Sequence, residues 1–262
     1  MPFCRTKGAK MSFYKYCASG NDFIIYADEG RTDRSELAKM LCDRHSGIGA
    51  DGLIAILPSD EYDFEWDFYN CDGSVPAMCG NGARAAAHFA VNFLGKNSHL
   101  NFLTKAGKIA ASVDGELVEI SLGEVRDEKV PLEIEGRAWQ GCDTGVPHLV
   151  HFCENEEEFA NFDLKMCKFL RDKFNSNINF AQILSPTHLR VRTFERGVED
   201  ETLACGTGMA ASFYLAHKNS LLQNAAKVQP ASGEELFLRY EGGRIYFKGR
   251  VRCCFEANYH FS

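Results

Sequence analysis

Two stretches of the chain decide its fold. They are Cys79-Gly80-Asn81-Gly82-Ala83-Arg84-Ala85-Ala86-Ala87 and Cys205-Gly206-Thr207-Gly208-Met209-Ala210-Ala211-Ser212. Each is a Cys-Gly-x-Gly turn followed by small residues. This pattern is typical of a helix that begins at a tight turn and packs closely on a sheet.

The positions of other residues repeat along the chain as well. Asn21 lies 125 residues before Val146, Asn70 lies 125 residues before Glu195, and the two cysteines are 126 residues apart. One residue is therefore added within residues 197–204. We predict two similar halves, residues 11–125 and 126–252, each a sheet wrapped around a central helix, with the site in the cleft between them.

Composition restricts the kind of protein. The 262 residues contain 29 Lys and Arg against 36 Asp and Glu, a net charge of −7, without a basic block. This argues against nucleic-acid and anionic-membrane partners and favours a small-molecule partner. No segment has the length and apolar character of a membrane span or a signal peptide. We therefore expect a cytoplasmic protein, with residues 1–10 an extension ahead of the fold.

Local patterns predict some of the elements. Residues 13–27 have the composition of two strands around a turn at residues 18–22. Residues 35–44 predict a short helix with Ser35 as its N-cap. Alternating segments across Asp114-Gly115 predict a hairpin.

The chain has eleven cysteines, an odd number that weighs against a disulfide scaffold. They lack C-x-x-C spacing, so we expect no metal site. Two are candidates for chemistry, because a thiol at a helix N-terminus lies near unpaired N–H groups that favour the thiolate. We interpret the other nine as structural: Cys4, Cys17, Cys42, Cys71, Cys142, Cys153, Cys167, Cys253 and Cys254.

Two such thiols facing one cleft suggest a reaction. The two helix ends could hold one carboxylate, with its α-carbon between the sulfurs. One sulfur would then remove the α-proton from one face and the other would return a proton to the opposite face. The product is the inverted stereocentre.

The motifs resemble those of the diaminopimelate epimerase family from about residue 11 to the end. The resemblance rests on Gly20-Asn21-Asp22-Phe23, on residues 43–52 and 70–74, on the two Cys-Gly-x-Gly turns, and on Glu195-Arg196-Gly197. It implies an α/β (α+β) fold of two pseudo-symmetric, mostly antiparallel domains, with residues 253–262 returning to the first. It also implies a PLP-independent isomerase that interconverts LL- and meso-diaminopimelate for lysine and peptidoglycan synthesis, and a possible homodimer.

The resemblance assigns roles to individual residues. Cys79 and Cys205 correspond to the two acid/base thiols. The substrate-binding positions are Asn21, Asn70, Gly80, Asn81, His148, Asn177, Glu195, Arg196, Gly206 and Thr207. Arg196 can hold a carboxylate bidentately, and Glu195 can accept from an ammonium group.

Two departures from the family pattern affect the prediction. Val146 stands where the family commonly has asparagine before Pro-His, which removes a polar contact and suggests relaxed specificity, for example toward glutamate. The added residue within 197–204 leaves the path of that loop open. A thiol-dependent hydrolase or redox enzyme using one cysteine with His148 remains an alternative, as does a non-catalytic binder.

Overall fold

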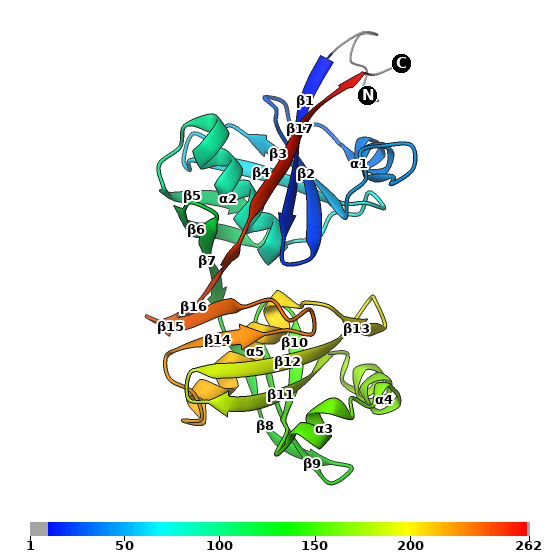
Figure 1. The fold of residues 1–262 in the computed structure, drawn as a ribbon, viewed down its shortest axis with the longest axis vertical. Coiled ribbons are helices and arrows are strands. Elements are labelled where there is room, and N and C mark those ends of the chain that lie inside the picture. The colour runs from blue at the N-terminus through cyan, green and yellow to red at the C-terminus, as the bar shows by residue number, and fades with distance from the viewer. Residues whose placement is uncertain (1–9, 261–262) are drawn as a thin grey trace. The chain divides into compact units, whose positions relative to one another are not determined.

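The computed structural model describes residues 10–260, so residues 1–9 of the predicted extension lie outside it (Figure 1). The chain folds into two compact units. Unit 1 runs to Ile120 and resumes at Gly249, and unit 2 is Ser121–Lys248. The boundaries predicted at residues 125 and 252 lie a few residues further along the chain.

Unit 1 is a sheet with one helix on each face. The strands, in spatial order, are β17 (Arg252–His260), β1 (Lys10–Ala18), β2 (Asn21–Ala27), β3 (Gly52–Leu57), β4 (Phe64–Asn70), β5 (His99–Thr104), β6 (Gly107–Asp114) and β7 (Leu117–Glu124). The helices are α1 (Ser35–Cys42) and α2 (Gly80–Leu94). The C-terminal strand β17 pairs with β1 and so belongs to this unit.

Unit 2 repeats this plan with additional short elements. The strands, in spatial order, are β8 (Arg126–Ile134), β9 (Arg137–Asp143), β10 (Pro147–Phe152), β11 (Asn177–Ser185), β12 (His188–Glu195), β14 (Ala225–Gln229), β15 (Leu236–Glu241) and β16 (Arg244–Arg250). The short strand β13 (Asp200–Thr202) also pairs with β12. The helices are α3 (Glu156–Ala160), α4 (Leu164–Phe174) and α5 (Gly206–Lys218).

The strand directions follow one order in both units. From β17 to β7 the successive pairs are antiparallel, antiparallel, parallel, antiparallel, parallel, antiparallel and antiparallel. The pairs from β8 to β16 have the same sequence of directions. The predicted α/β fold of two similar, mostly antiparallel halves is therefore confirmed, and the duplication extends to the strand pairing.

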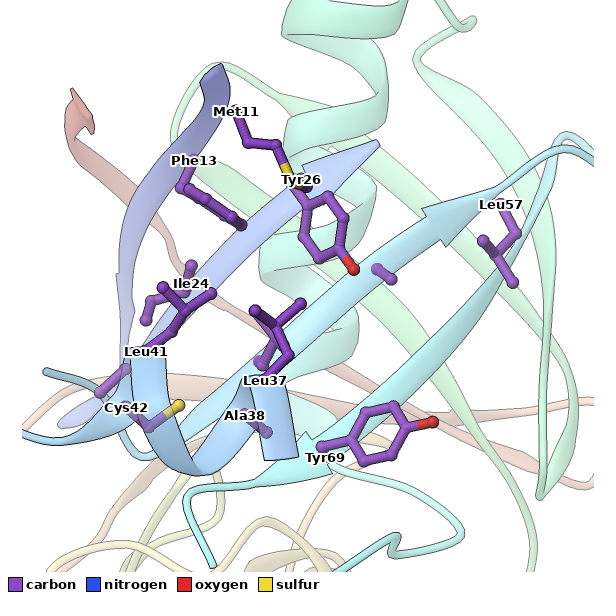
Figure 2. Packing of buried hydrophobic residues seen from close by; sticks show 13 residues of the cluster. Met11, Phe13, Ile24, Tyr26, Leu37, Ala38, Leu41, Cys42, Leu57 and Tyr69 are labelled. Atoms are coloured by element: carbon purple, nitrogen blue, oxygen red, sulfur yellow. The ribbon is translucent and has the colours of Figure 1, made fainter. Parts of the chain in front are cut away.

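The two faces of the unit 1 sheet have different cores. On one face, α1 packs against the cluster in Figure 2, which includes Ile24 and Tyr26 of β2. Alternation along β2 turns Phe23 to the other face, where α2 begins. In both units most of the central helix is buried, and the small residues of its first turns let it approach the strands closely.

The predicted cap of the first helix is wrong by one residue. The N-cap of α1 is Arg34, and Ser35 is the first helical residue. The cause is Asp33, whose Oδ1 accepts both from the backbone N of Ser35, at 3.0 Å, and from its hydroxyl, at 2.6 Å. Within residues 10–260, no helix has the length and apolar character to cross a membrane.

The second glycine of each Cys-Gly-x-Gly turn yields a stability prediction. A Cβ at Gly208 would lie 2.4 Å from Asn179 Oδ1 and 2.8 Å from Thr193 Oγ1, whereas a Cβ at Gly82 would meet its nearest atom at 3.3 Å. We expect Gly208→Ala to lower the free energy of unfolding by about 1 to 3 kcal/mol because the sheet must shift. Urea denaturation measures this, with Gly82→Ala as the matched control. Equal losses in both variants would contradict the account.

Candidate active site

Cys79 caps the central helix of unit 1. Its backbone is extended, with φ −142° and ψ 114°, and its sulfur accepts from the Gly82 N–H at 3.4 Å. The predicted binding residues Gly80 and Asn81 form the first turn of α2. The Cys-Gly-x-Gly sequence therefore directs a thiol and free helical N–H groups to the same end of the helix.

Two predicted asparagines are joined in unit 1. Asn81 Nδ2 donates to Asn21 Oδ1 at 2.7 Å, and Asn21 Nδ2 donates to Asp51 Oδ2 at 3.1 Å. The guanidinium of Arg84, which is fully buried, donates to Asn81 Oδ1 at 2.9 Å and to Ser19 Oγ at 2.5 Å. These bonds fix the orientation of the Asn21 and Asn81 side-chain amides, because each amide has a partner at its oxygen and another at its nitrogen.

Asn70 lies at the end of β4, where it begins a turn. Its Nδ2 donates to Ser74 Oγ at 2.9 Å, and its backbone is held by Gly73 and Ser74. The structure gives Asn70 no hydrogen bond with Asn21 or Asn81, so these residues form two separate polar groups in unit 1.

In unit 2, Cys205 lies near Glu195. Cys205 is buried and caps α5, whose first residues are the predicted binding residues Gly206 and Thr207. The Cys205 sulfur lies 3.5 Å from Thr207 Oγ1, and the Glu195 carboxylate accepts from Thr202 Oγ1 at 2.9 Å. Burial raises the pKa of Glu195, while Thr202 and Cys205 oppose the shift. The result is a desolvated carboxylate close to the candidate thiol.

The expectation that helix position lowers the thiol pKa is wrong for Cys205. Burial, followed by the charge of Glu195, raises the pKa of Cys205 to about 12. The backbone N–H groups of Thr207 and Gly208 and the Thr207 hydroxyl act in the expected direction, but they are outweighed. Cys205 is therefore a thiol rather than a thiolate in the free protein, because removing water from the sulfur costs more than the helix end returns.

His148, Asn177 and Arg196 form a second group in unit 2. Asn177 Oδ1 accepts from the backbone N of Arg196 at 2.7 Å, and its Nδ2 lies 3.4 Å from His148 Nε2. The Arg196 guanidinium donates to the Asn175 carbonyl at 3.1 Å. Burial lowers the pKa of His148 to about 3, so the imidazole is neutral at ordinary pH.

The two sequence departures have simple local structures. Val146 lies in the turn between β9 and β10 and accepts from the Thr144 backbone through its carbonyl. The segment with the added residue forms a tight hairpin between β12 and β13 in which Glu199 adopts a left-handed φ of 61°. The Glu199 carboxylate pairs with Arg171 at 2.8 Å, which fixes the path of this loop.

One group of side chains among residues 10–260 has the composition of a metal site. The ligand atoms of His151, Cys153 and Glu158 lie within 4.8 Å of one another. However, His151 Nε2 bonds Glu158 Oε1 at 2.8 Å, and Arg137 donates to the same oxygen at 3.3 Å. The Glu158 carboxylate is therefore already bonded to protein groups, one of which is the guanidinium cation of Arg137.

Sequence reasoning missed residues that hold the predicted ones in place. Asp51 orients Asn21, Thr202 orients Glu195, and Asn179 contacts His148 at 3.0 Å. Asp51 lies in one of the motifs that carry the family resemblance, and Thr202 lies in the segment with the added residue. Asn179 lies two residues after Asn177 on the same strand, a spacing that places both on one face.

Comparison with known proteins identifies the family. A family model described as diaminopimelate epimerase matches residues 13–127 and 142–253. Diaminopimelate epimerase of Campylobacter lari is 58% identical over 252 residues, which cover 96% of this chain and 100% of that protein. The chain belongs to the diaminopimelate epimerase family. The Helicobacter pylori member is 42% identical and covers 92% of this chain and 94% of its own length.

Solved structures share the fold at lower identity. A phenazine biosynthesis protein of the PhzF family from Enterococcus faecalis has a TM-score of 0.75 at 14% identity, covering 97% of this chain and 100% of its own. A probable proline racemase from Agrobacterium radiobacter K84 has a TM-score of 0.68 at 14% identity, covering 96% and 93%. These two show the fold alone. Membership of the diaminopimelate epimerase family makes the chain an isomerase and does not favour the racemase, hydrolase and redox alternatives.

The contact between Thr202 and Glu195 generates a pH prediction. The Thr202 hydroxyl stabilises the charged carboxylate, so Thr202→Val raises the pKa of Glu195 further. If the isomerase needs this carboxylate ionised, the acid limb of kcat/KM moves to higher pH, by about one unit. Thr202→Ser keeps the hydroxyl and is the control. A pH profile of kcat/KM for Thr202→Val that superimposes on the wild-type profile would contradict this prediction.

Proposed function

We propose that this isomerase interconverts LL- and meso-diaminopimelate with Cys79 and Cys205 as its two bases and without a cofactor. The observation that carries the proposal is the equivalent placement of the two thiols, each as the N-cap of the central helix of its unit. A duplicated thiol at a duplicated helix end suits a reaction that treats both faces of one carbon alike.

Each half-reaction is a proton transfer between carbon and sulfur. In one direction the Cys79 thiolate takes the α-proton and becomes a thiol, and the electron pair left on carbon spreads into the substrate carboxylate. The Cys205 thiol then gives its proton to the opposite face and becomes a thiolate. The other direction exchanges the roles. The protonated state of Cys205 in the free protein supports its role as donor in the first direction.

The helix ends and the polar side chains stabilise the reacting carboxylate and bind the rest of the substrate in this proposal. We assign the backbone of Gly80, Asn81, Gly206 and Thr207 to the reacting carboxylate, because N–H groups at a helix start stabilise the charge that develops there. We assign the binding of the rest of the substrate to six side chains: Asn21, Asn70, His148, Asn177, Glu195 and Arg196. In this proposal each unit contributes one thiol and one set of binding groups to the same small molecule.

Replacing each thiol tests the assignment. We expect Cys79→Ala and Cys205→Ala each to lower the rate of conversion of LL- to meso-diaminopimelate by about 10²-fold or more, because each removes the only proton carrier on one face. Chiral chromatography of the product, without added pyridoxal phosphate, measures this. Cys254→Ala, which changes an exposed thiol, is the control. Loss of activity in only one of the first two variants would contradict a two-base mechanism.

Oxidation provides a second test. If both thiols face one carbon, they can join as a disulfide, so we expect air oxidation to abolish activity and dithiothreitol to restore it. Peptide mapping of the oxidised protein should then find Cys79 linked to Cys205. Full activity after complete oxidation of both thiols would show that the sulfurs are placed differently.

Assembly and location extend the proposal. We expect a homodimer in the cytoplasm, where thiols stay reduced. Light scattering of the purified chain measures the first, and cell fractionation measures the second.

A further inference from the structure

The strand residues that face the start of the central helix differ between the two units. In unit 1, buried Phe23, Ile54 and Phe68 lie on successive strands, and the first two approach the Cβ position of Gly82. At an offset of 125 residues the chain has three buried polar residues, His148, Asn179 and Thr193. Strand register confirms the correspondence, because Ile54 is opposite Phe68 and Asn179 is opposite Thr193.

The orientation of Asn179 is fixed by two unambiguous partners. Its Nδ2 donates to the Leu149 carbonyl at 2.9 Å, and its Oδ1 accepts from Thr193 Oγ1 at 2.9 Å. The same Nδ2 lies 3.0 Å from His148 Nδ1. An amide nitrogen can only donate, so His148 Nδ1 is an acceptor and carries no proton.

The other ring nitrogen must then hold the proton. A neutral imidazole has one N–H, which leaves it on Nε2. Asn177 turns its own N–H toward Nε2, because the Arg196 backbone occupies its oxygen. Two donors, separated by 3.4 Å, therefore face one another. An acceptor located to one side of the pair, such as a carboxylate oxygen at hydrogen-bond distance from each nitrogen, would bind to both.

We propose that Asn179, oriented by Thr193, is a positioning residue that holds His148 in the tautomer protonated on Nε2. In this state His148 donates a hydrogen bond from Nε2 and cannot act there as a base. The role of His148 toward substrate rests on the proposed function, whereas the tautomer itself does not. Gly208 belongs to the same device, because a side chain there would displace Asn179 and Thr193.

Nitrogen NMR of the full-length chain tests the tautomer directly. In protein labelled with ¹⁵N-histidine, we expect the Nε2 of His148 to resonate as a protonated nitrogen and its Nδ1 as an unprotonated one at pH 7. His148→Gln assigns the signals by their loss. A wild-type spectrum with the proton on Nδ1, or with both nitrogens protonated, would overturn the proposal.

Asn179→Asp keeps the shape of the side chain but replaces the nitrogen that donates to His148 Nδ1 with an oxygen that can only accept. A carboxylate can only accept, so it draws a proton onto Nδ1, and we expect the Nδ1 signal to become that of a protonated nitrogen. We expect kcat to fall by about 10²- to 10⁴-fold, with a smaller change in KM. Thr193→Ser, which keeps the hydroxyl, should leave both the spectrum and kcat near wild type. An unchanged His148 spectrum in folded Asn179→Asp would refute the positioning role.

The two readouts separate this proposal from the proposed function. The Nε2–H pattern in a chain without epimerase activity would support the positioning role and refute the function. Epimerase activity with the opposite tautomer would do the reverse. If Asn179→Asp fails to fold, the wild-type spectrum and the Thr193→Ser spectrum still decide the tautomer.

Discussion

The close approach of each central helix to its sheet is the constraint on which the rest of the structure depends. At Gly208 the strands leave no room for a Cβ, and at Gly82 they leave little. Small residues continue along both helices, so this proximity is kept for several turns. A helix held so tightly fixes the position of its N-cap, and the N-cap of each helix is a cysteine.

The two units use one architecture with different chemistry. In unit 1 the strand residues that face the central helix are apolar. The polar network lies at the helix start, where buried Arg84 donates to Asn81 and Asn81 donates to Asn21. In unit 2 the corresponding strand residues are polar, and Glu195 lies close enough to the Cys205 thiol to affect its pKa. The two units therefore share their strand pairing and an N-cap thiol but differ in the groups that surround it.

Much of the fold followed from residue spacing, because duplication marks equivalent helix starts independently of propensity. The same reasoning placed Cys79 and Cys205 as N-caps. It failed where tertiary effects compete: the helix end predicts a lowered thiol pKa, but the desolvation of Cys205 is visible only once the chain has folded. It also missed Asn179, because a polar residue in the run Asn177-Ile178-Asn179-Phe180 shows its role only when strand register places it opposite Thr193. The cap at Ser35 failed because the hydroxyl and backbone N–H of Ser35 are themselves bound to Asp33.

The central claim is that two groups, one on each face of the α-carbon, carry the proton. The most direct measurement follows LL-diaminopimelate in deuterium oxide at low conversion, with isotope content read by mass spectrometry in both isomers. The account predicts that the newly formed meso isomer carries one deuterium at the inverted carbon, delivered by an exchanged thiol. Unreacted LL isomer should stay largely free of label at this stage. A meso product that keeps its original hydrogen would show one base acting on both faces and would contradict the account.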